Sequence, residues 1–203
     1  MLQYITHTSD RYTIPQQVRM VIDGGCRWIQ LRMKHASDDE VEAMARQIIP
    51  MCEESGTILV IDDHVEVVMR TKVHGVHLGK NDMDPAQARE YLGPHAIIGC
   101  TANTAADITS LAGLDIDYIG LGPFRHTDTK ANLAPVIGLE GYRRIMAEIR
   151  AAGIELPVVA IGGITSADVT PLLQAGASGV AVSGAILRAN DPVRETSTII
   201  NGN

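Results

Sequence analysis

The sequence has few aromatic residues, few cysteines and no long apolar run. Aromatic residues make up 3% of the 203 residues, which leaves little to stack on nucleic-acid bases, and the formal charge of −7 repels polyanions. No apolar stretch approaches the roughly 20 residues that cross a bilayer, and the N-terminus lacks the basic and apolar regions of a signal peptide. We therefore expect no nucleic-acid partner, no membrane association and a cytoplasmic location.

The three cysteines form no recognisable motif. Cys26, Cys52 and Cys100 are odd in number, far apart and set among apolar neighbours. Without a Cys-x-x-Cys pair, neither zinc binding nor redox chemistry is indicated. We expect reduced thiols in the core.

The chain does contain a regular alternation of apolar runs and helical patterns. The apolar runs have the length of buried strands and occupy residues 2–6, 28–31, 58–61, 75–78, 96–100, 118–121, 158–161 and 179–182. Stretches with the 3.6-residue period of helices lie at residues 16–24, 38–54, 65–71, 85–92, 104–111, 139–151 and 166–175. This alternation predicts an α/β fold with a parallel sheet: a single-domain (β/α)8 TIM barrel over residues 1–203, with a flexible tail after about residue 194.

Two loops rich in small residues follow the seventh and eighth predicted strands. The first contains Gly162 and Gly163, and the second contains Ser183 and Gly184. Backbone N–H groups at these two strand ends bind phosphate in many (β/α)8 barrels. The loops therefore predict a phosphorylated small molecule as the ligand.

Gln30, Arg32 and Lys34 alternate at the end of the second predicted strand, so their side chains point the same way. Arginine offers a planar fork for phosphate oxygens, lysine a mobile charge, and glutamine a donor and an acceptor for a heterocycle. These residues either bind an anionic ligand at the barrel mouth or form a solvated strand end. The spacing alone favours neither alternative.

Aspartates end the next two predicted strands. Asp62 and Asp63 follow the third strand, and Asp82 follows the fourth. Carboxylates at adjacent strand ends can share a Mg²⁺ ion that keeps some waters and also binds substrate phosphate. Alternatively, these aspartates cap the following helices. His77 lies in an apolar run, and we expect a hydrogen-bonded core or strand-end histidine there, without a chemical role.

The longest unpatterned segment, residues 122–135, follows the sixth predicted strand. Its length and its place at the mouth of the barrel predict a lid over the site. Thr127, Thr129 and Lys130 offer two hydroxyls and a cation that suit a phosphate or a pyrimidine ring. The same residues are also ordinary for an exposed turn.

Taken together, these segments resemble the thiamine phosphate synthase family over nearly the whole chain. The matching motifs are QLRMK (30–34), IDD (61–63), GVHLGKND (75–82), GLGPF (120–124) with TDTK (127–130), and IGGI (161–164). The resemblance implies a transferase that joins 4-amino-2-methyl-5-hydroxymethylpyrimidine diphosphate to 4-methyl-5-(β-hydroxyethyl)thiazole phosphate. Pyrophosphate leaves first, and the thiazole nitrogen captures the resulting pyrimidine cation, with Mg²⁺ as cofactor.

The resemblance also implies roles for individual residues. It assigns the metal to Asp63 and Asp82, the diphosphate and the catalytic charges to Arg32, Lys34 and Lys130, and the pyrimidine to Gln30. Thr127 and Thr129 correspond to loop threonines at the substrates, and Gly163, Ser183 and Gly184 to the thiazole-phosphate cradle. The family implies no general base and does not fix the oligomeric state, so a homo-oligomer is compatible with the sequence.

Several positions depart from the family pattern. Asp62 replaces the usual Asn, and it either joins the metal shell or weakens diphosphate binding; Thr101 replaces a Ser, and Asn103 a His. Ser183 and Gly184 replace a common Ile-Ser pair. The alternatives are a thiazole tautomerase, which uses a histidine near Asn103, and a non-catalytic barrel that binds a phosphorylated ligand.

Overall fold

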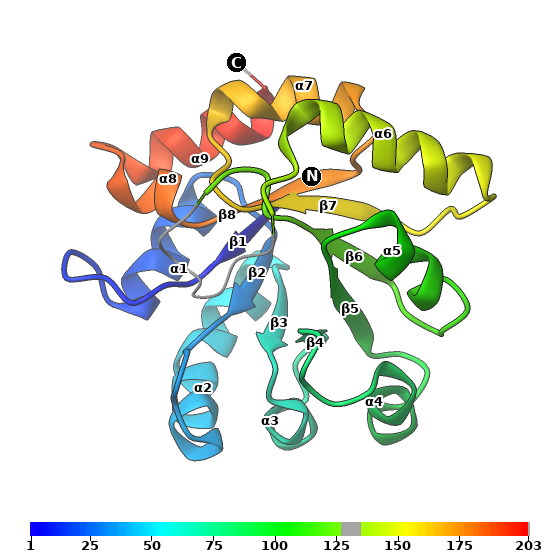
Figure 1. Cartoon of the computed structure of the whole chain (residues 1–203). Coiled ribbons are helices and arrows are strands. Elements are labelled where there is room, and N and C mark those ends of the chain that lie inside the picture. The colour runs from blue at the N-terminus through cyan, green and yellow to red at the C-terminus, as the bar shows by residue number, and fades with distance from the viewer. Residues whose placement is uncertain (127–134, 203) are drawn as a thin grey trace.

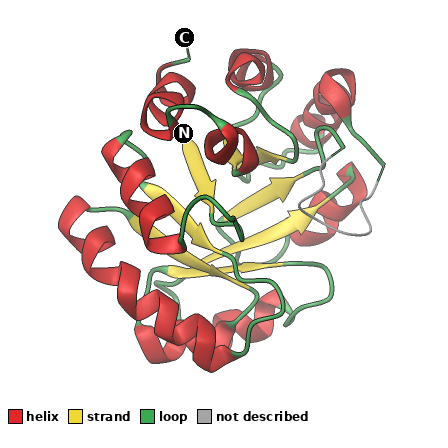
Figure 2. Ribbon diagram, turned by 90° about the vertical axis from the view of Figure 1, so that its left-hand side faces the viewer, coloured by secondary structure: helices red, strands yellow, loops and turns green. Residues whose placement is uncertain are grey.

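The computed structural model describes residues 1–126 and 135–202, and it shows a closed barrel of eight parallel strands inside a layer of helices (Figures 1 and 2). Each strand pairs with the next, and β8 closes the barrel by pairing with β1. The strands are β1 (Leu2–Ile5), β2 (Trp28–Leu31), β3 (Ile58–Asp62), β4 (Gly75–Leu78), β5 (Ile97–Ala102), β6 (Tyr118–Leu121), β7 (Val158–Ile161) and β8 (Gly179–Val182). The predicted (β/α)8 barrel is confirmed.

Helices connect successive strands along the outside of the barrel. They are α1 (Ile14–Asp23), α2 (Asp38–Ser55), α3 (Val65–Thr71), α4 (Pro85–Leu92), α5 (Ala105–Leu111), α6 (Gly138–Ala151), the 3-10 turn η1 (Ser166–Asp168), α7 (Val169–Gln174), α8 (Gly184–Arg188) and α9 (Pro192–Asn201). Local signals explain where several begin. Ser37 and Glu40 form a reciprocal capping box before α2, and Asp84 accepts hydrogen bonds from the first backbone N–H groups of α4.

The C-terminal tail differs from the sequence prediction. Residues expected to be flexible after about residue 194 belong to α9, which packs on α1 and α8. Thr196 and Ile199 are buried there, so this helix completes the outer layer of the barrel.

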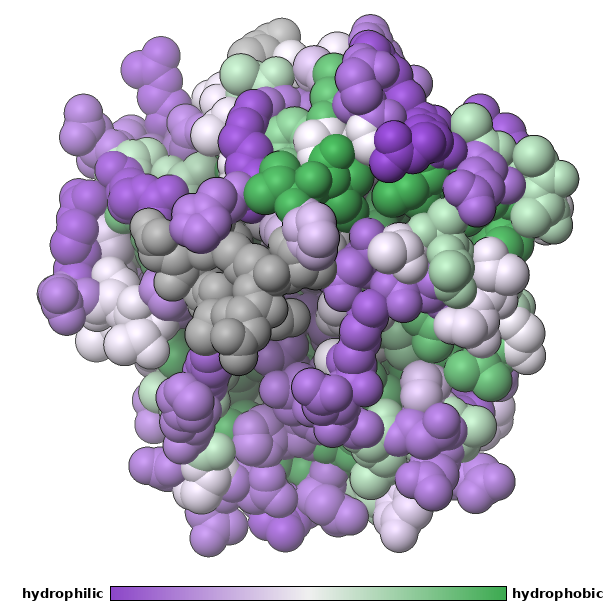
Figure 3. Space-filling model, in the orientation of Figure 1, coloured by the Kyte–Doolittle hydropathy of each residue, from purple (hydrophilic) through white to green (hydrophobic). Residues whose placement is uncertain are grey.

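The apolar residues divide between two cores. The larger core lies between the strands and the helices, and the smaller one lies inside the barrel and contains Ile5, Trp28, Tyr118, Val159 and Ala181. Trp28 and Tyr118 meet edge to face, with ring centroids 4.7 Å apart. Most of the surface visible in Figure 3 carries hydrophilic side chains, as expected when the apolar ones fill these cores. All three cysteines are buried free thiols, as predicted.

Gly99 on β5 provides the space that Tyr118 occupies. A Cβ atom at position 99 would lie 2.0 Å from Cζ of Tyr118, so Gly99→Ala must displace a buried ring. We expect this overpacking to lower the free energy of unfolding by about 3 kcal/mol, which corresponds to a fall in Tm of about 6–12 °C. Gly113→Ala is the control, because nothing lies within 4 Å of its Cβ position. Equal melting temperatures for the two variants would contradict this account.

In the part of the chain that the structure describes, no helix is both long and apolar enough to span a membrane.

Candidate active site

A cavity of about 710 Å³ opens at the carboxyl ends of the strands, a size typical of small-molecule sites. All eight strands or the loops that follow them contribute to its lining. The cavity brings together every described residue that the sequence assigned to the site: Gln30, Arg32, Lys34, Asp62, Asp63, Asp82, Thr101, Gly163, Ser183 and Gly184. Thr127, Thr129 and Lys130, and with them most of the predicted lid, lie outside the described residues.

The end of β2 supplies the cationic side of the cavity. Thr6 holds this strand end in place, because its hydroxyl accepts a hydrogen bond from the Arg32 N–H and donates one to the Arg32 carbonyl. Nε of Arg32 lies 3.1 Å from Oδ2 of Asp62 in a half-buried ion pair. Asp62 therefore orients Arg32, and its extra negative charge is offset by a neighbouring cation.

Asp63 and Asp82 form the acidic side of the cavity. The two carboxyl groups share a hydrogen bond, and Oδ2 of Asp82 also accepts the Gly79 N–H at 2.6 Å. Neither aspartate caps a helix: His64 precedes α3 without a side-chain cap, and Asp84 caps α4. Asp63 has a φ of 68°, which is unusual for a residue with a side chain, and strain of this kind is common at functional sites.

The proximity of these carboxyl groups changes the titration of Asp63. Partial desolvation in the concave mouth, the hydrogen bond with Asp82 and the charges of Asp62 and Asp82 raise the pKa of Asp63 to about 8. Without a cation, the pair therefore holds a proton at neutral pH. In the absence of a cation, the two carboxyl groups share a proton because their negative charges repel each other. A divalent cation can replace that proton and bind both groups in their ionised form.

The described residues contain no group of three or more His, Cys, Asp or Glu side chains at metal-binding spacing. A cation between Asp63 and Asp82 would need further oxygen ligands, which water and substrate phosphate can supply. Mg²⁺ binds in this way in many phosphate-processing enzymes, with one or two carboxylates and several waters. The donor set fits the predicted ion.

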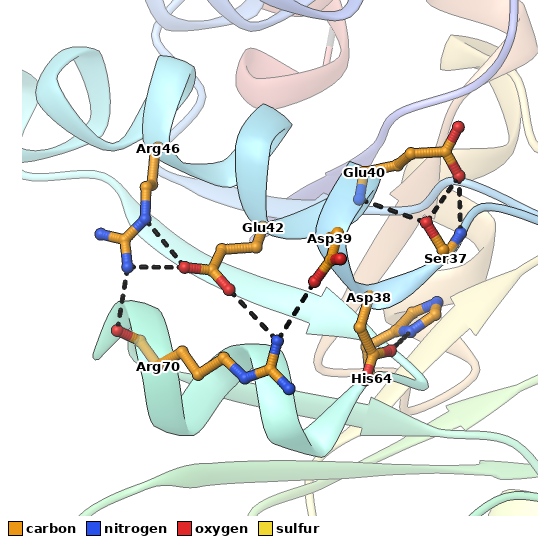
Figure 4. A network of polar contacts seen from close by, with 8 residues as sticks. All are labelled: Ser37, Asp38, Asp39, Glu40, Glu42, Arg46, His64 and Arg70. Atoms are coloured by element: carbon orange, nitrogen blue, oxygen red, sulfur yellow. Dashed lines mark hydrogen bonds and ion pairs between the residues drawn. The ribbon is translucent and has the colours of Figure 1, made fainter.

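A network between α2 and α3 holds the turn that carries Asp63 (Figure 4). Nδ1 of His64, the next residue, lies 2.6 Å from Oδ1 of Asp38 in the first turn of α2. Further along, Arg70 of α3 contacts both Asp39 and Glu42. Exposed pairs of this kind contribute little stability each, but the His64 contact ties the aspartate turn to a long helix.

The floor of the cavity is a buried hydrogen-bond network that sequence reasoning missed. His77 lies between Tyr118 and Thr101, with 3.0 Å from Nδ1 to the phenol oxygen and 3.0 Å from Nε2 to the threonine hydroxyl. Gln3 and Gln30 also bond to the Tyr118 hydroxyl. Burial raises the pKa of Tyr118, so the phenol stays neutral. The histidine is hydrogen-bonded, as predicted, but it also lines the cavity.

The glycine-rich loop after β7 forms the opposite wall. Gly162 and Gly163 have φ angles of 100° and 69°, and a Cβ on Gly162 would lie 2.8 Å from Cα of Pro123. Both the conformation and the close approach require glycine. Arg125 braces this loop, because its guanidinium pairs with Asp168 through both carboxylate oxygens and donates to the Gly163 carbonyl.

The loop after β8 completes this wall with Ser183 and Gly184. Among the described residues, the buried hydroxyl oxygen of Ser183 has no hydrogen-bond partner. Buried polar atoms normally have a partner, so an orphan at the rim of a cavity suggests a ligand atom. The wall thus offers glycine backbone and a free hydroxyl, which suits a phosphate group.

Comparisons with known proteins agree with this geometry. The family described as thiamine monophosphate synthase matches residues 2–186. A thiamine-phosphate synthase of Bacteroides thetaiotaomicron is 54% identical over 200 residues, covering 98% of this chain and 96% of the relative; one of Flavobacterium johnsoniae is 42% identical over 193 residues, covering 94% and 90%. The solved structure of a thiamine phosphate pyrophosphorylase from Pyrococcus furiosus superimposes with a TM-score of 0.85 at 31% identity, covering 99% of this chain and 94% of that one.

Proposed function

Because the chain belongs to the thiamine monophosphate synthase family and is a transferase that makes thiamine phosphate, we propose how its cavity divides the work of that reaction. The substrates are 4-amino-2-methyl-5-hydroxymethylpyrimidine diphosphate and 4-methyl-5-(β-hydroxyethyl)thiazole phosphate. The observation that carries the proposal is the arrangement of charge. Asp63 and Asp82 face each other on one side of the cavity, the cations that follow β2 line another, and the glycine-rich loops after β7 and β8 form a third.

The diphosphate binds between the acidic pair and the end of β2. Arg32, held by Asp62, offers its guanidinium to the phosphate oxygens, and Lys34 supplies a mobile positive charge. Asp63 and Asp82 would hold Mg²⁺, which when bound neutralises charge that develops on the leaving pyrophosphate. Lys130 belongs to the same set on the evidence of the sequence motif.

The pyrimidine ring lies on the polar floor of the cavity. Gln30 is 2% exposed and bonds to the Tyr118 hydroxyl, so its amide is fixed beside the floor. Thr101 is held by His77 in the same way. Fixed donors and acceptors orient the ring so that its methylene carbon faces the thiazole nitrogen rather than water.

The thiazole phosphate binds at the loops after β7 and β8. Gly163, Ser183 and Gly184 line the cavity there, and the orphan Ser183 hydroxyl is a candidate donor to a phosphate oxygen. The thiazole nitrogen attacks with its own lone pair, so these residues bind and orient and need not move a proton.

The tautomerase alternative requires an acid–base group near Asn103. Its side-chain amide instead donates to the Gly122 carbonyl at 2.6 Å and fixes the loop after β6. An amide does not titrate in the physiological range, so this position cannot shuttle a proton. The observation favours the synthase.

The direct test uses the purified protein, both substrates and Mg²⁺, with thiamine phosphate and pyrophosphate measured by chromatography. We expect product only when both substrates and the metal are present, and loss of product when a chelator is added. Absence of thiamine phosphate under conditions in which a relative from Bacteroides is active would refute the proposed chemistry. We assign the reaction to the cytoplasm, in keeping with three free thiols.

A further inference from the structure

Arg188, the last residue of α8, lies at the rim of the cavity beside the two glycine-rich loops. Its guanidinium extends over Gly184. A Cβ atom built on Gly184 would lie 2.5 Å from Nη1 of Arg188, 3.0 Å from Cζ and 3.1 Å from Nη2. The planar group therefore occupies the space that a side chain at position 184 would fill.

The charge of Arg188 is not used by the described part of the chain. Among the arginines and lysines that line the cavity, Arg32 pairs with Asp62 and Lys80 pairs with Asp107, whereas Arg188 and, on the β2 side, Lys34 form no ion pair with a residue in 1–126 or 135–202. Within those ranges, it is also the one arginine or lysine that lines the cavity from β7, β8 and the segments that follow them. Among the described residues, Arg188 is thus the one available cation on the glycine-rich wall.

The positive charge of Arg188 also acts on a histidine that lines the cavity. His7, at the end of β1, lines the same space, and its pKa is lowered by desolvation and by the positive charges of Arg32 and Arg188. The lowered pKa favours the neutral imidazole, so His7 adds no positive charge beside Arg188. The orphan hydroxyl of Ser183, in the residue before Gly184, is a second unsatisfied group in the loop after β8.

We propose that Arg188 binds the phosphate of the thiazole substrate and makes this site selective for the phosphorylated thiazole over the free alcohol. The inference rests on the proposed function, because it assumes that the loops after β7 and β8 hold that phosphate. The guanidinium donates to phosphate oxygens in a charge-assisted pair, while the Ser183 hydroxyl and the loop backbone serve the others.

The test compares Arg188→Ala with the wild type on two acceptors, thiazole phosphate and the thiazole alcohol. For the wild type we expect tighter binding of the phosphate form. The substitution should raise KM for thiazole phosphate about tenfold, with kcat changed by less than about twofold, as expected for loss of one charge-assisted contact made equally in the ground and transition states. Binding of the alcohol, measured by titration calorimetry, should not change. The KM of Arg188→Lys for thiazole phosphate should lie between those of the wild type and Arg188→Ala.

Arg194→Ala is the matched control, because it removes an exposed arginine from the adjacent helix α9 without touching the cavity. It should leave both KM values unchanged. Suppose that Arg188→Ala has an unaltered KM for thiazole phosphate while the wild type still prefers the phosphate form. That result would overturn the role of Arg188, but the loops after β7 and β8 would remain the proposed phosphate site. A rise confined to the KM of the pyrimidine diphosphate would also overturn it. If the wild type makes thiamine phosphate but does not prefer the phosphorylated thiazole, both the proposed phosphate site at the loops after β7 and β8 and the role of Arg188 would be wrong.

Discussion

Asp82→Asn is expected to lower kcat for thiamine phosphate formation about 10³-fold, because an anionic ligand to the metal supplies several kcal/mol to the departure of a diphosphate. The amide keeps an oxygen that can accept the Gly79 N–H, so the loop after β4 should retain its shape. Affinity for thiazole phosphate, which we propose binds at the loops after β7 and β8, should remain within about twofold of the wild type. Steady-state kinetics and titration calorimetry measure the two quantities.

The concentration of Mg²⁺ that gives half-maximal activity provides an independent measurement on the same variant. It should rise in Asp82→Asn, since Asp63 then faces an amide instead of a second carboxylate. An effect on kcat alone, with unchanged Mg²⁺ dependence, would show that Asp82 acts on the substrate without the metal.

Asp84→Ala is the matched control, two residues further along the same loop. Its carboxylate accepts the backbone N–H groups of Ala86 and Gln87 at the start of α4. Loss of this cap should reduce stability by about 1 kcal/mol and leave kcat unchanged. Equal losses of turnover and of thiazole-phosphate affinity in Asp82→Asn would indicate a structural role, and the metal assignment would then be wrong.

The sequence predicts the barrel well because each strand is buried on both faces and therefore appears as an uninterrupted apolar run. The first predicted strand runs one residue too far, to Thr6, and the fifth starts one residue too early, but two strand ends are placed too early where polar residues continue the strand. β3 extends to Asp62, which pairs with His77, and β5 extends through Thr101, which pairs with Gly120. At these positions the backbone hydrogen bonds of the sheet continue while polar side chains face the cavity. A prediction that follows apolar composition therefore places the end of the strand too early.

The missed C-terminal helix has a different cause. The sequence after Arg194 is mostly polar, and this composition predicts a tail although the signals of a helix are present: Asp191 accepts the Arg194 N–H, Pro192 occupies the first helical position and Gly202 follows the last. Thr196 is nevertheless fully buried, because its hydroxyl donates to the Pro192 carbonyl one turn earlier. A local bond of this kind allows a polar side chain to enter the core, and residue type alone does not reveal it.

Within the site, the sequence identifies residues but not their partners. The two-residue spacing of Gln30, Arg32 and Lys34 indicates a common face, and the structure places all three at the cavity. That Asp62 pairs with Arg32 depends on the register between β2 and β3, which no local pattern encodes. Arg188 shows the same limit, since its role depends on the space above Gly184.

A second large effect is expected from pH. Because the pKa of Asp63 is raised to about 8 in the metal-free protein, this carboxyl is mainly protonated at pH 7 and must ionise before it binds a cation. Mg²⁺ affinity should therefore fall about tenfold for each pH unit below about 8, with release of close to one proton per ion bound. Titrations of Mg²⁺ alone, in two buffers of different ionisation enthalpy, measure that proton directly.

Stability should show the linked effect with a definite sign. The folded-state pKa of Asp63 lies above the ordinary value of 3.8, so the folded protein binds this proton more tightly than the unfolded chain does. The proton on Asp63 therefore stabilises the folded state fully below about pH 4, and this stabilisation is lost as pH rises through about 8. The metal-free protein should thus lose Tm over that window, and Mg²⁺ should restore most of it at the alkaline end.

Asp63→Asn separates this explanation from a general pH effect. The amide cannot ionise, so the variant should lose both the proton release and the part of the pH-dependent change in Tm that the carboxyl causes. Asp23→Asn, at the end of α1 and outside the residues that line the cavity, should behave as the wild type. If Asp63→Asn still releases a proton when it binds Mg²⁺, another group holds that proton, and the ion would not lie between Asp63 and Asp82.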